Sequence, residues 1–243
     1  MHLTAIAHLR RADPILAAII ARVPSCTFAV RAEGTHVDAL LRAIVYQQLS
    51  GSAAVTILGR VVTHFSGRSP TPAELLATPD EPLRAAGLSR QKIGYARDLM
   101  AKVLSGEVPL DAIARQDDET VITELTRVKG IGRWTAQMFL MFRLGRPDVF
   151  PELDLGIRNA IQRAYRLRKP PTPERMRSIA VAWSPHRTIA SWYLWRSLDL
   201  DRPSATPPDK RQGGTVAAMG EAKKVRRQKN RKPGMQRRKT STA

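Results

Sequence analysis

Three carboxylates stand close together in the segment Asp148-Val149-Phe150-Pro151-Glu152-Leu153-Asp154. Asp154 directly precedes apolar residues at helical spacing, namely Ile157, Ala160, Ile161 and Tyr165. It is therefore expected to cap that helix, where backbone N–H groups keep a carboxylate ionised at neutral pH. Two roles are compatible at this position. The carboxylate caps the helix, and it can also stabilise positive charge that develops on a sugar ring during cleavage of a glycosidic bond.

A second candidate site is the short sequence Lys129-Gly130-Ile131-Gly132-Arg133 between two amphipathic segments. Two glycines around one aliphatic residue allow a sharp turn that exposes N–H groups at the start of the following helix, and such N–H groups bind phosphate. Ile131 is expected to anchor the turn in the core, while Lys129 and Arg133 add positive charge. On this pattern alone, an ordinary helical hairpin with a glycine cap is an equally good interpretation.

The elements that must position these residues are helices, and the predicted fold class is all-α. Asp13 and Pro14 form a good N-cap and first turn for a helix that runs to about Val23. Residues 36–62 carry one apolar face, with a break near Ser50-Gly51. No segment alternates over the length of a strand. Further helices are expected at residues 72–77, 81–86, 90–104, 109–114, 118–128, 134–144, 155–167, 172–183 and 186–198, so that the hairpin spans residues 118–144.

The 243-residue chain is strongly basic, with a formal net charge of +19 from 40 Lys and Arg against 21 Asp and Glu. Clustered cations release counterions when they neutralise phosphates, so this charge indicates a polyanionic partner. Residues 203–243 hold 12 Lys and Arg against 2 Asp and Glu and have no aromatic side chain. This composition predicts a disordered basic tail, which scans DNA non-specifically, acts as a localisation signal in a nucleated cell, or only solubilises the protein.

Compartment and cofactor class follow from what the sequence lacks. The apolar run from Pro14 to Ala21 is far too short to span a membrane, and no secretory signal is recognisable. The single cysteine, Cys26, excludes an intrachain disulfide framework and a four-cysteine iron–sulfur cluster. We therefore expect a cytoplasmic protein associated with the nucleoid, or a nuclear one in a eukaryote, without a membrane partner.

The segment from Leu125 to Ile157 closely resembles the signature of the helix-hairpin-helix-GPD superfamily of DNA glycosylases, in which a hairpin and a Gly- and Pro-containing loop precede a catalytic aspartate. Trp134 and the Asp148-Val149-Phe150 run are similar to the 3-methyladenine DNA glycosylase II branch. The resemblance covers about residues 10–200. It continues through Ala43 to Ser50, Ala86 to Lys92, Trp183 to Arg187 and Trp192 to Trp195.

The resemblance implies one glycosylase domain over residues 1–202, in a short form without an N-terminal β-rich domain. Two helical lobes would flank a cleft that binds DNA and the target base. One lobe would come mainly from residues 36–150, and the other from the N-terminal helix together with residues 155–200. The expected partner is double-stranded DNA that contains alkylated bases, and the expected oligomeric state is a monomer.

The resemblance also implies roles for individual residues. Asp154 would be the catalytic carboxylate. Trp134 and Trp195 would be walls of a pocket for the flipped base, because aromatic faces attract cationic alkylated purines. Trp183 is included with the pocket but is expected to pack behind the other two. Met138 and Leu155 stand where a well-known bacterial relative has further pocket aromatics.

The expected DNA contacts lie in the hairpin and in one other loop. In the hairpin they are Lys129, Gly130, Gly132, Arg133 and Thr135, and in the loop either Gln47 or Gln48 would fill the gap that the flipped base leaves. A polar residue on the face of a helix is the alternative interpretation for these glutamines. The family's hairpin carbonyls can hold Na⁺ or K⁺, which would map to the backbones of Thr126, Val128 and Gly130. No other cofactor is expected.

The chemistry implied is hydrolysis without strand cleavage. Relatives that also cut the strand have a Schiff-base lysine where this chain has Trp134. The expected enzyme is therefore a monofunctional glycosylase that leaves an abasic site. The alternative is a non-catalytic protein that uses the hairpin only to hold DNA, since folds can outlive their chemistry.

Overall fold

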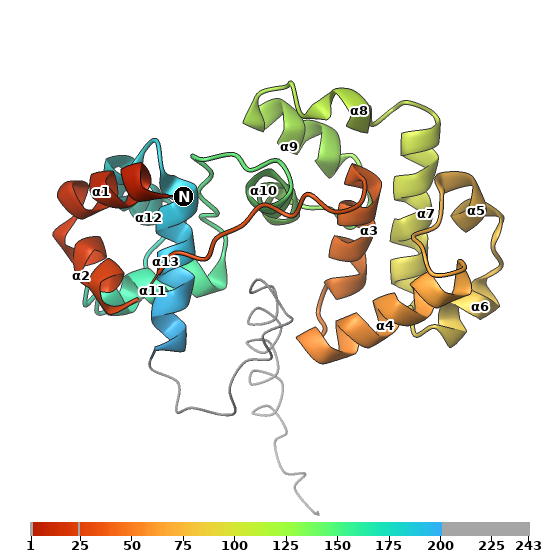
Figure 1. Cartoon of the computed structure of the whole chain (residues 1–243), viewed down its shortest axis with the longest axis horizontal. Coiled ribbons are helices and arrows are strands. Elements are labelled where there is room, and N and C mark those ends of the chain that lie inside the picture. Colours follow the sequence, from red (N-terminus) through yellow and green to blue (C-terminus); the bar gives the residue numbers. More distant parts are fainter. Residues whose placement is uncertain (1, 24, 201–243) are drawn as a thin grey trace, which may run out of the picture.

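The computed structural model describes residues 2–23 and 25–200, which form thirteen α-helices, one 3-10 helix and no strand (Figure 1). The all-α prediction is confirmed. The predicted tail, residues 203–243, lies outside the described residues. The helices are α1 (Leu3–Ala12), α2 (Pro14–Arg22), α3 (His36–Tyr46), α4 (Gly51–His64), α5 (Pro72–Ala77), α6 (Asp80–Ala85), α7 (Arg90–Leu104), α8 (Leu110–Ile113), α9 (Asp118–Thr126), α10 (Arg133–Phe142), α11 (Leu155–Ala164), α12 (Pro173–Ala180), η1 (Val181–Trp183) and α13 (Arg187–Asp199).

Most helices begin within one residue of the predicted start. Asp13 caps α2 by accepting hydrogen bonds from the backbone N–H groups of Ile15 and Leu16. The periodic segment 36–62 breaks after Tyr46, and Gln48 in the break has a positive φ of 59°. The helix expected over residues 172–183 is shorter than predicted, because α12 ends at Ala180 and the chain tightens into η1 before the Ser184-Pro185 bond.

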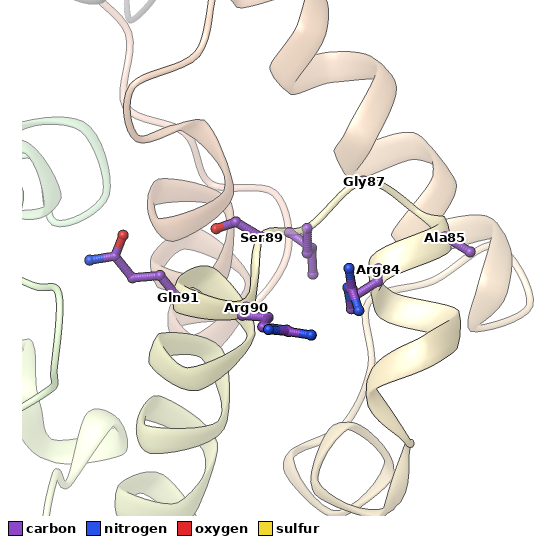
Figure 2. A pocket seen from close by; sticks show the side chains of 7 residues that line it. Arg84, Ala85, Gly87, Ser89, Arg90 and Gln91 are labelled. Atoms are coloured by element: carbon purple, nitrogen blue, oxygen red, sulfur yellow. The ribbon is translucent and has the colours of Figure 1, made fainter.

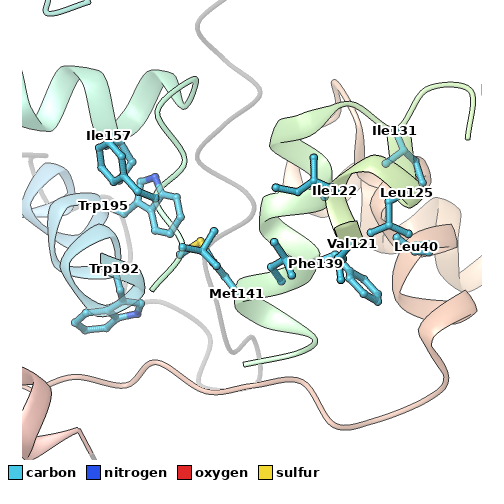
Figure 3. Packing of buried hydrophobic residues seen from close by; sticks show 14 of the residues in the cluster. Leu40, Val121, Ile122, Leu125, Ile131, Phe139, Met141, Ile157, Trp192 and Trp195 are labelled. Atoms are coloured by element: carbon cyan, nitrogen blue, oxygen red, sulfur yellow. The ribbon is translucent and has the colours of Figure 1, made fainter. Parts of the chain in front are cut away.

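The helices pack in two groups (Figure 1). In the first group α3, α5 and α6 pack against the long α7, and α4 and α8 pack against α3. In the second group α1, α2, α11, α12 and α13 pack together with η1. Helix α10 lies between the groups. Its buried side chains join one continuous apolar core, which extends from Leu125 and Ile131 of the hairpin through Met141 to Ile157 and Trp195 (Figure 3). Helix α10 therefore connects the core beneath the hairpin with the core beneath α11, the helix that follows Asp154.

A buried polar cluster holds the second group of helices together. Asp13 is only 7% exposed, and its Oδ2 atom accepts a hydrogen bond from Nε1 of Trp183 at 2.8 Å and another from the hydroxyl of Tyr165. These residues come from the start of α2, the end of α11 and η1. The cluster therefore fixes three elements to one carboxylate. No helix in residues 2–23 or 25–200 is long and apolar enough to cross a membrane.

Candidate active site

Asp154 is the N-cap residue of α11, as predicted, and its side chain is almost completely buried at 3% exposure. Its Oδ1 atom accepts a hydrogen bond of 2.7 Å from the backbone N–H of Ile157. The bond satisfies one of the N–H groups that have no partner within the helix at its start. Local sequence is sufficient for this arrangement, because a short acceptor side chain before an amphipathic segment is the usual start of a helix.

Two tryptophans donate to the same carboxylate from different helices. Nε1 of Trp134, in the first turn of α10, lies 2.8 Å from Oδ2 of Asp154, and Nε1 of Trp195, near the end of α13, lies 2.9 Å from Oδ1. A carboxylate has about four lone-pair positions. Three N–H donors therefore leave about one acceptor position free for a bound molecule.

The backbone beside Asp154 leaves little room for a side chain. A Cβ atom on Gly156 would lie 3.0 Å from Oδ1 of Asp154 and 3.1 Å from Cδ1 of Trp195. The Trp195 ring also stacks on Phe142, with ring centroids 6.0 Å apart and planes inclined by 27°. Packing from three directions thus fixes the carboxylate in one orientation.

Partly exposed apolar side chains lie next to Asp154 in the sequence and on α10. Leu153 is 58% exposed and Leu155 is 38% exposed, although the carboxylate between them is buried. Trp134 and Met138, which lie one helical turn apart on α10, are half-buried. Apolar and aromatic side chains that reach the surface next to a fixed carboxylate could receive a planar, apolar ring.

Trp183 does not share this position, and its inclusion with the pocket is corrected. Its ring is fully buried, and its indole N–H is bonded to Asp13 rather than to Asp154. It packs edge-on against Phe150, with ring centroids 5.7 Å apart. A side chain without exposed surface cannot contact a bound base, so Trp183 supports the fold behind the site, which is the placement that we expected for it.

The hairpin has the geometry of a phosphate site. Gly130 has a φ of +84°, and a Cβ atom there would overlap the ring of Tyr95, so the turn requires glycine. Ile131 is buried and anchors the turn. Gly132 is the N-cap of α10, has no side chain to cap that helix, and has open space where a Cβ atom would stand. The first N–H groups of α10 therefore remain available to an anion.

The cationic side chains of the hairpin are arranged differently from expectation. Arg133 donates to Glu119 at 2.8 Å through NH1 and to Glu152 at 3.3 Å through Nε, so two carboxylates balance its charge. The backbone N–H of Lys129 donates to Asp98 at 2.8 Å, while its side chain stays largely exposed, with Nζ 3.9 Å from the other carboxylate oxygen. Of the two, Lys129 is better placed to reach a phosphate. Thr135 is buried and faces the protein interior.

Gln47 and Gln48 both lie in the loop between α3 and α4, but their side chains have different surroundings. The Nε2 atom of Gln47 donates to the carbonyl oxygen of Gly130 at 2.8 Å and so ties this loop to the hairpin. Gln48 is exposed and extends from a left-handed backbone conformation. The carbonyl of Val128 accepts from the N–H of Ile131 at 3.0 Å. Two of the three carbonyls expected at a cation site, Val128 and Gly130, thus have partners within the protein, and Thr126 is the third.

The segment 86–92, which contributed to the resemblance, lines a surface hollow of about 880 Å³ between α6 and α7 (Figure 2). Ser89 caps α7 there by accepting from the N–H of Lys92. The hollow has neither a carboxylate nor an aromatic ring in its wall, so it lacks the chemistry found around Asp154. Its lining residues are Arg84, Ala85, Gly87, Leu88, Ser89, Arg90 and Gln91.

Several polar residues around the site were not identified from the sequence. The backbone N–H of Lys129 donates to Asp98, and the Arg133 guanidinium donates to Glu119. The side-chain amide of Gln137 donates to the backbone carbonyl of Phe150. Asp148, which the sequence showed only as a neighbouring carboxylate, accepts from Ser184 and from the Arg187 guanidinium. Burial raises the pKa of this carboxyl, but the hydrogen bonds from Arg187 and Ser184 outweigh that effect and lower the pKa overall. These partners are distant in sequence, so no local motif marks them.

A fold of this kind, with a glycine hairpin and a capped aspartate one helix later, defines a protein class. The model of the HhH-GPD superfamily of base excision DNA repair proteins matches residues 41–185. The chain is 39% identical over 165 residues to DNA-3-methyladenine glycosylase 1 of Schizosaccharomyces pombe, across 67% of this chain and 72% of that protein. The chain belongs to the HhH-GPD superfamily of base excision DNA repair proteins.

Further similarities agree with this assignment. The alkylbase DNA glycosidase-like protein mag2 of S. pombe is 30% identical over 198 residues, which are 80% of this chain and 93% of that protein. The structure of S. pombe 3-methyladenine DNA glycosylase Mag1 in complex with abasic DNA superposes with a TM-score of 0.71 and 33% identity, over 83% of this chain and 100% of the other. DNA-3-methyladenine glycosidase from Bacillus halodurans has a TM-score of 0.71 and 34% identity, over 79% and 88% of the two chains.

Proposed function

We propose that this protein is a monofunctional DNA glycosylase of the 3-methyladenine glycosylase II type, which hydrolyses the N-glycosidic bond of alkylated bases in double-stranded DNA and leaves an abasic site. The observation that supports this most is Asp154, a buried carboxylate with three N–H donors and about one free acceptor position, between the exposed Leu153 and Leu155. The named activities of the similar proteins point in the same direction.

The fixed carboxylate suits the charge that develops in this reaction. As the bond between C1′ and the base nitrogen breaks, its electron pair leaves with the base and the deoxyribose ring becomes positively charged. Asp154 would stabilise that ring through its free lone pair and orient the water that attacks C1′. A purine alkylated at N3 or N7 is already cationic and leaves as a neutral base, so little acid catalysis is required for such lesions.

The binding geometry supports extrusion of the target base. Open N–H groups at Gly132 and the first turn of α10 would hold a phosphate of the damaged strand. Because Gln47 is bonded to the hairpin while Gln48 is exposed, we assign Gln48 to the gap in the base stack. The base itself would enter beside the half-buried Trp134 and Met138, where a flipped base is commonly held between aromatic and apolar side chains.

The assignment as monofunctional depends on the absence of an amine at the site. Trp134 is bonded to Asp154 at the position where a Schiff-base lysine would be needed. Lys129 lies on the other side of the hairpin, toward Asp98 on α7. Water is then the only effective nucleophile for C1′.

The test is incubation of the protein with duplexes that each contain one lesion, among them 7-methylguanine, ethenoadenine, hypoxanthine and uracil, followed by hot alkali. We expect alkali-dependent strand breaks with at least one alkylated base, and little covalent adduct when borohydride is present. The same preparation of Asp154→Asn controls for a contaminating glycosylase. Tight DNA binding without base release on every lesion would favour a non-catalytic DNA-binding protein instead. Abundant trapping that depends on Lys129 would contradict the monofunctional assignment.

A further inference from the structure

A second buried carboxylate lies two residues before Asp154. Glu152 is only 8% exposed, on the short turn in which the N–H of Asp154 donates to the carbonyl of Pro151 at 2.9 Å. Its neighbour Leu153 points outward at 58% exposure. A carboxylate is costly to bury unless charged or polar partners compensate for the lost water, so the partners of Glu152 indicate what the protein gains from it.

Those partners come from two helices on different sides of the turn. The Nε2 atom of Gln137 lies 2.9 Å from Oε2 of Glu152, and Nε of Arg133 lies 3.3 Å from Oε1, both from α10. NH1 of Arg177, on α12, lies 3.6 Å from Oε1. The turn that carries Asp154 is therefore fixed to the hairpin helix and to the opposite group of helices through one side chain.

Gln137 strengthens this attachment because its amide nitrogen serves two acceptors. The same Nε2 atom that donates to Glu152 also donates to the backbone carbonyl of Phe150 at 3.0 Å. Gln137 is 2% exposed, so water cannot readily replace these bonds. Phe150, Glu152 and Asp154 are alternate residues of one segment, and α10 holds each of them, the last through Trp134.

We propose that Glu152 is a positioning residue that sets the orientation of Asp154 by fixing the catalytic turn to α10 and α12. The proposal rests on the proposed function of Asp154. Glu152 itself would not touch the substrate, because Gln137, Arg133 and Arg177 already surround its two carboxylate oxygens. Its effect is expected on the chemical step, since a displacement of a reacting group by about 1 Å can reduce a rate about 10²-fold. Contacts of the hairpin N–H groups with DNA do not require it.

The test compares Glu152→Ala with Glu174→Ala, a control that removes an exposed carboxylate from the same Arg177 on α12. Under single-turnover conditions we expect Glu152→Ala to release base about 10- to 100-fold more slowly, with a dissociation constant for the lesion duplex within about threefold of the original. Glu152→Gln keeps an acceptor for Gln137 and should recover part of the rate. Glu174→Ala should remain within about twofold. A rate for Glu152→Ala equal to that of the control would overturn the proposal.

A second readout does not depend on catalysis. In nitrogen-15 NMR spectra, the indole N–H resonances of Trp134 and Trp195 report their hydrogen bonds to Asp154, and that of Trp183 reports the separate bond to Asp13. We expect Glu152→Ala to move the first two signals and leave the third in place. Unchanged Trp134 and Trp195 signals would overturn the proposal. This result can be obtained even if the protein releases none of the tested bases, so failure of the proposed function and failure of the positioning role are distinguishable.

Discussion

Asp13 and Asp154 are two buried aspartates with almost the same local structure. Each is the N-cap of a helix, and each accepts backbone N–H bonds from the first turn. Each also accepts an indole N–H, Asp13 from Trp183 and Asp154 from Trp134 and Trp195. Their exposed fractions are 7% and 3%. Neither burial, capping nor an indole donor therefore identifies the residue that does chemistry.

The difference lies in what surrounds the two carboxylates. The second oxygen of Asp13 is occupied by the fully buried Trp183 and by Tyr165, whose phenol pKa is raised by burial and by its bond to Asp13. That phenol therefore remains protonated and keeps donating. Asp154 instead lies between the exposed Leu153 and Leu155 and retains about one free acceptor position. Asp13 has four donors and Asp154 has three. A fixed carboxylate with a free acceptor position can act on a substrate, whereas one with every position occupied stabilises the fold.

The largest effect is expected for Asp154→Asn. The amide keeps the size and the capping ability of the side chain but removes the negative charge opposite the sugar, so base release should fall by about 10²- to 10³-fold or more. Affinity for the lesion duplex should be equal or higher. Single-turnover base release and fluorescence anisotropy measure the two quantities. Near-normal turnover would remove Asp154 from the mechanism.

The matched change Asp13→Asn should act on stability instead. It replaces charge-assisted bonds to Trp183 and Tyr165 with weaker ones in a buried setting, so the free energy of unfolding should fall by about 2–4 kcal/mol. Urea denaturation followed by circular dichroism measures this change. The rate of base release per folded molecule should stay within about twofold. A rate loss comparable to that of Asp154→Asn would show that the two carboxylates are not separated as we describe.

A gentler comparison removes one indole donor from each carboxylate while keeping an aromatic ring. Trp195→Phe deletes the N–H that lies 2.9 Å from Asp154 and should slow base release by about tenfold. Trp183→Phe deletes the corresponding donor to Asp13 and should lower the free energy of unfolding by about 1–3 kcal/mol with little change in rate. Identical profiles for the two variants would contradict the division between the sites.

The smallest effect is expected in the hairpin, where the two glycines have different reasons to be glycine. Gly132→Ala has space for its Cβ atom and a negative φ, so the protein should fold normally but bind damaged and undamaged duplexes several-fold more weakly. Gly130→Ala would place its Cβ atom within the ring of Tyr95 at a positive φ and should destabilise the hairpin itself. Thermal denaturation and binding isotherms separate the two. Loss of binding to only one lesion in Gly132→Ala would argue against a phosphate contact.

The sequence was informative where chemistry is local. Helical spacing predicted the all-α fold, and short-range capping patterns placed Asp13 and Asp154 at helix starts. The two glycines predicted the hairpin because only glycine tolerates the conformation that Gly130 adopts. The segment 36–62 was expected to break near Ser50-Gly51, and the break occupies residues 47–50 between α3 and α4.

The partners of the polar side chains could not be predicted in the same way. Trp183 and Asp13 are 170 residues apart, and only the packing of α1, α2 and η1 brings them together. For the same reason Arg133 was expected beside a phosphate, whereas the fold places it between Glu119 and Glu152. Long-range pairs of this kind leave no local pattern, so Glu152 was noted only as a neighbour of Asp154.

The most direct test of the central claim is the single-turnover rate of base release per folded molecule, measured side by side for Asp13→Asn and Asp154→Asn. The folded fraction of each sample is determined by circular dichroism, and the lesion is the one that the unmodified protein releases fastest. We predict a folded but nearly inactive Asp154→Asn, and an Asp13→Asn variant that is less stable yet retains the original rate in its folded molecules. Equal normalised rates for the two variants would contradict the assignment of the chemistry to Asp154.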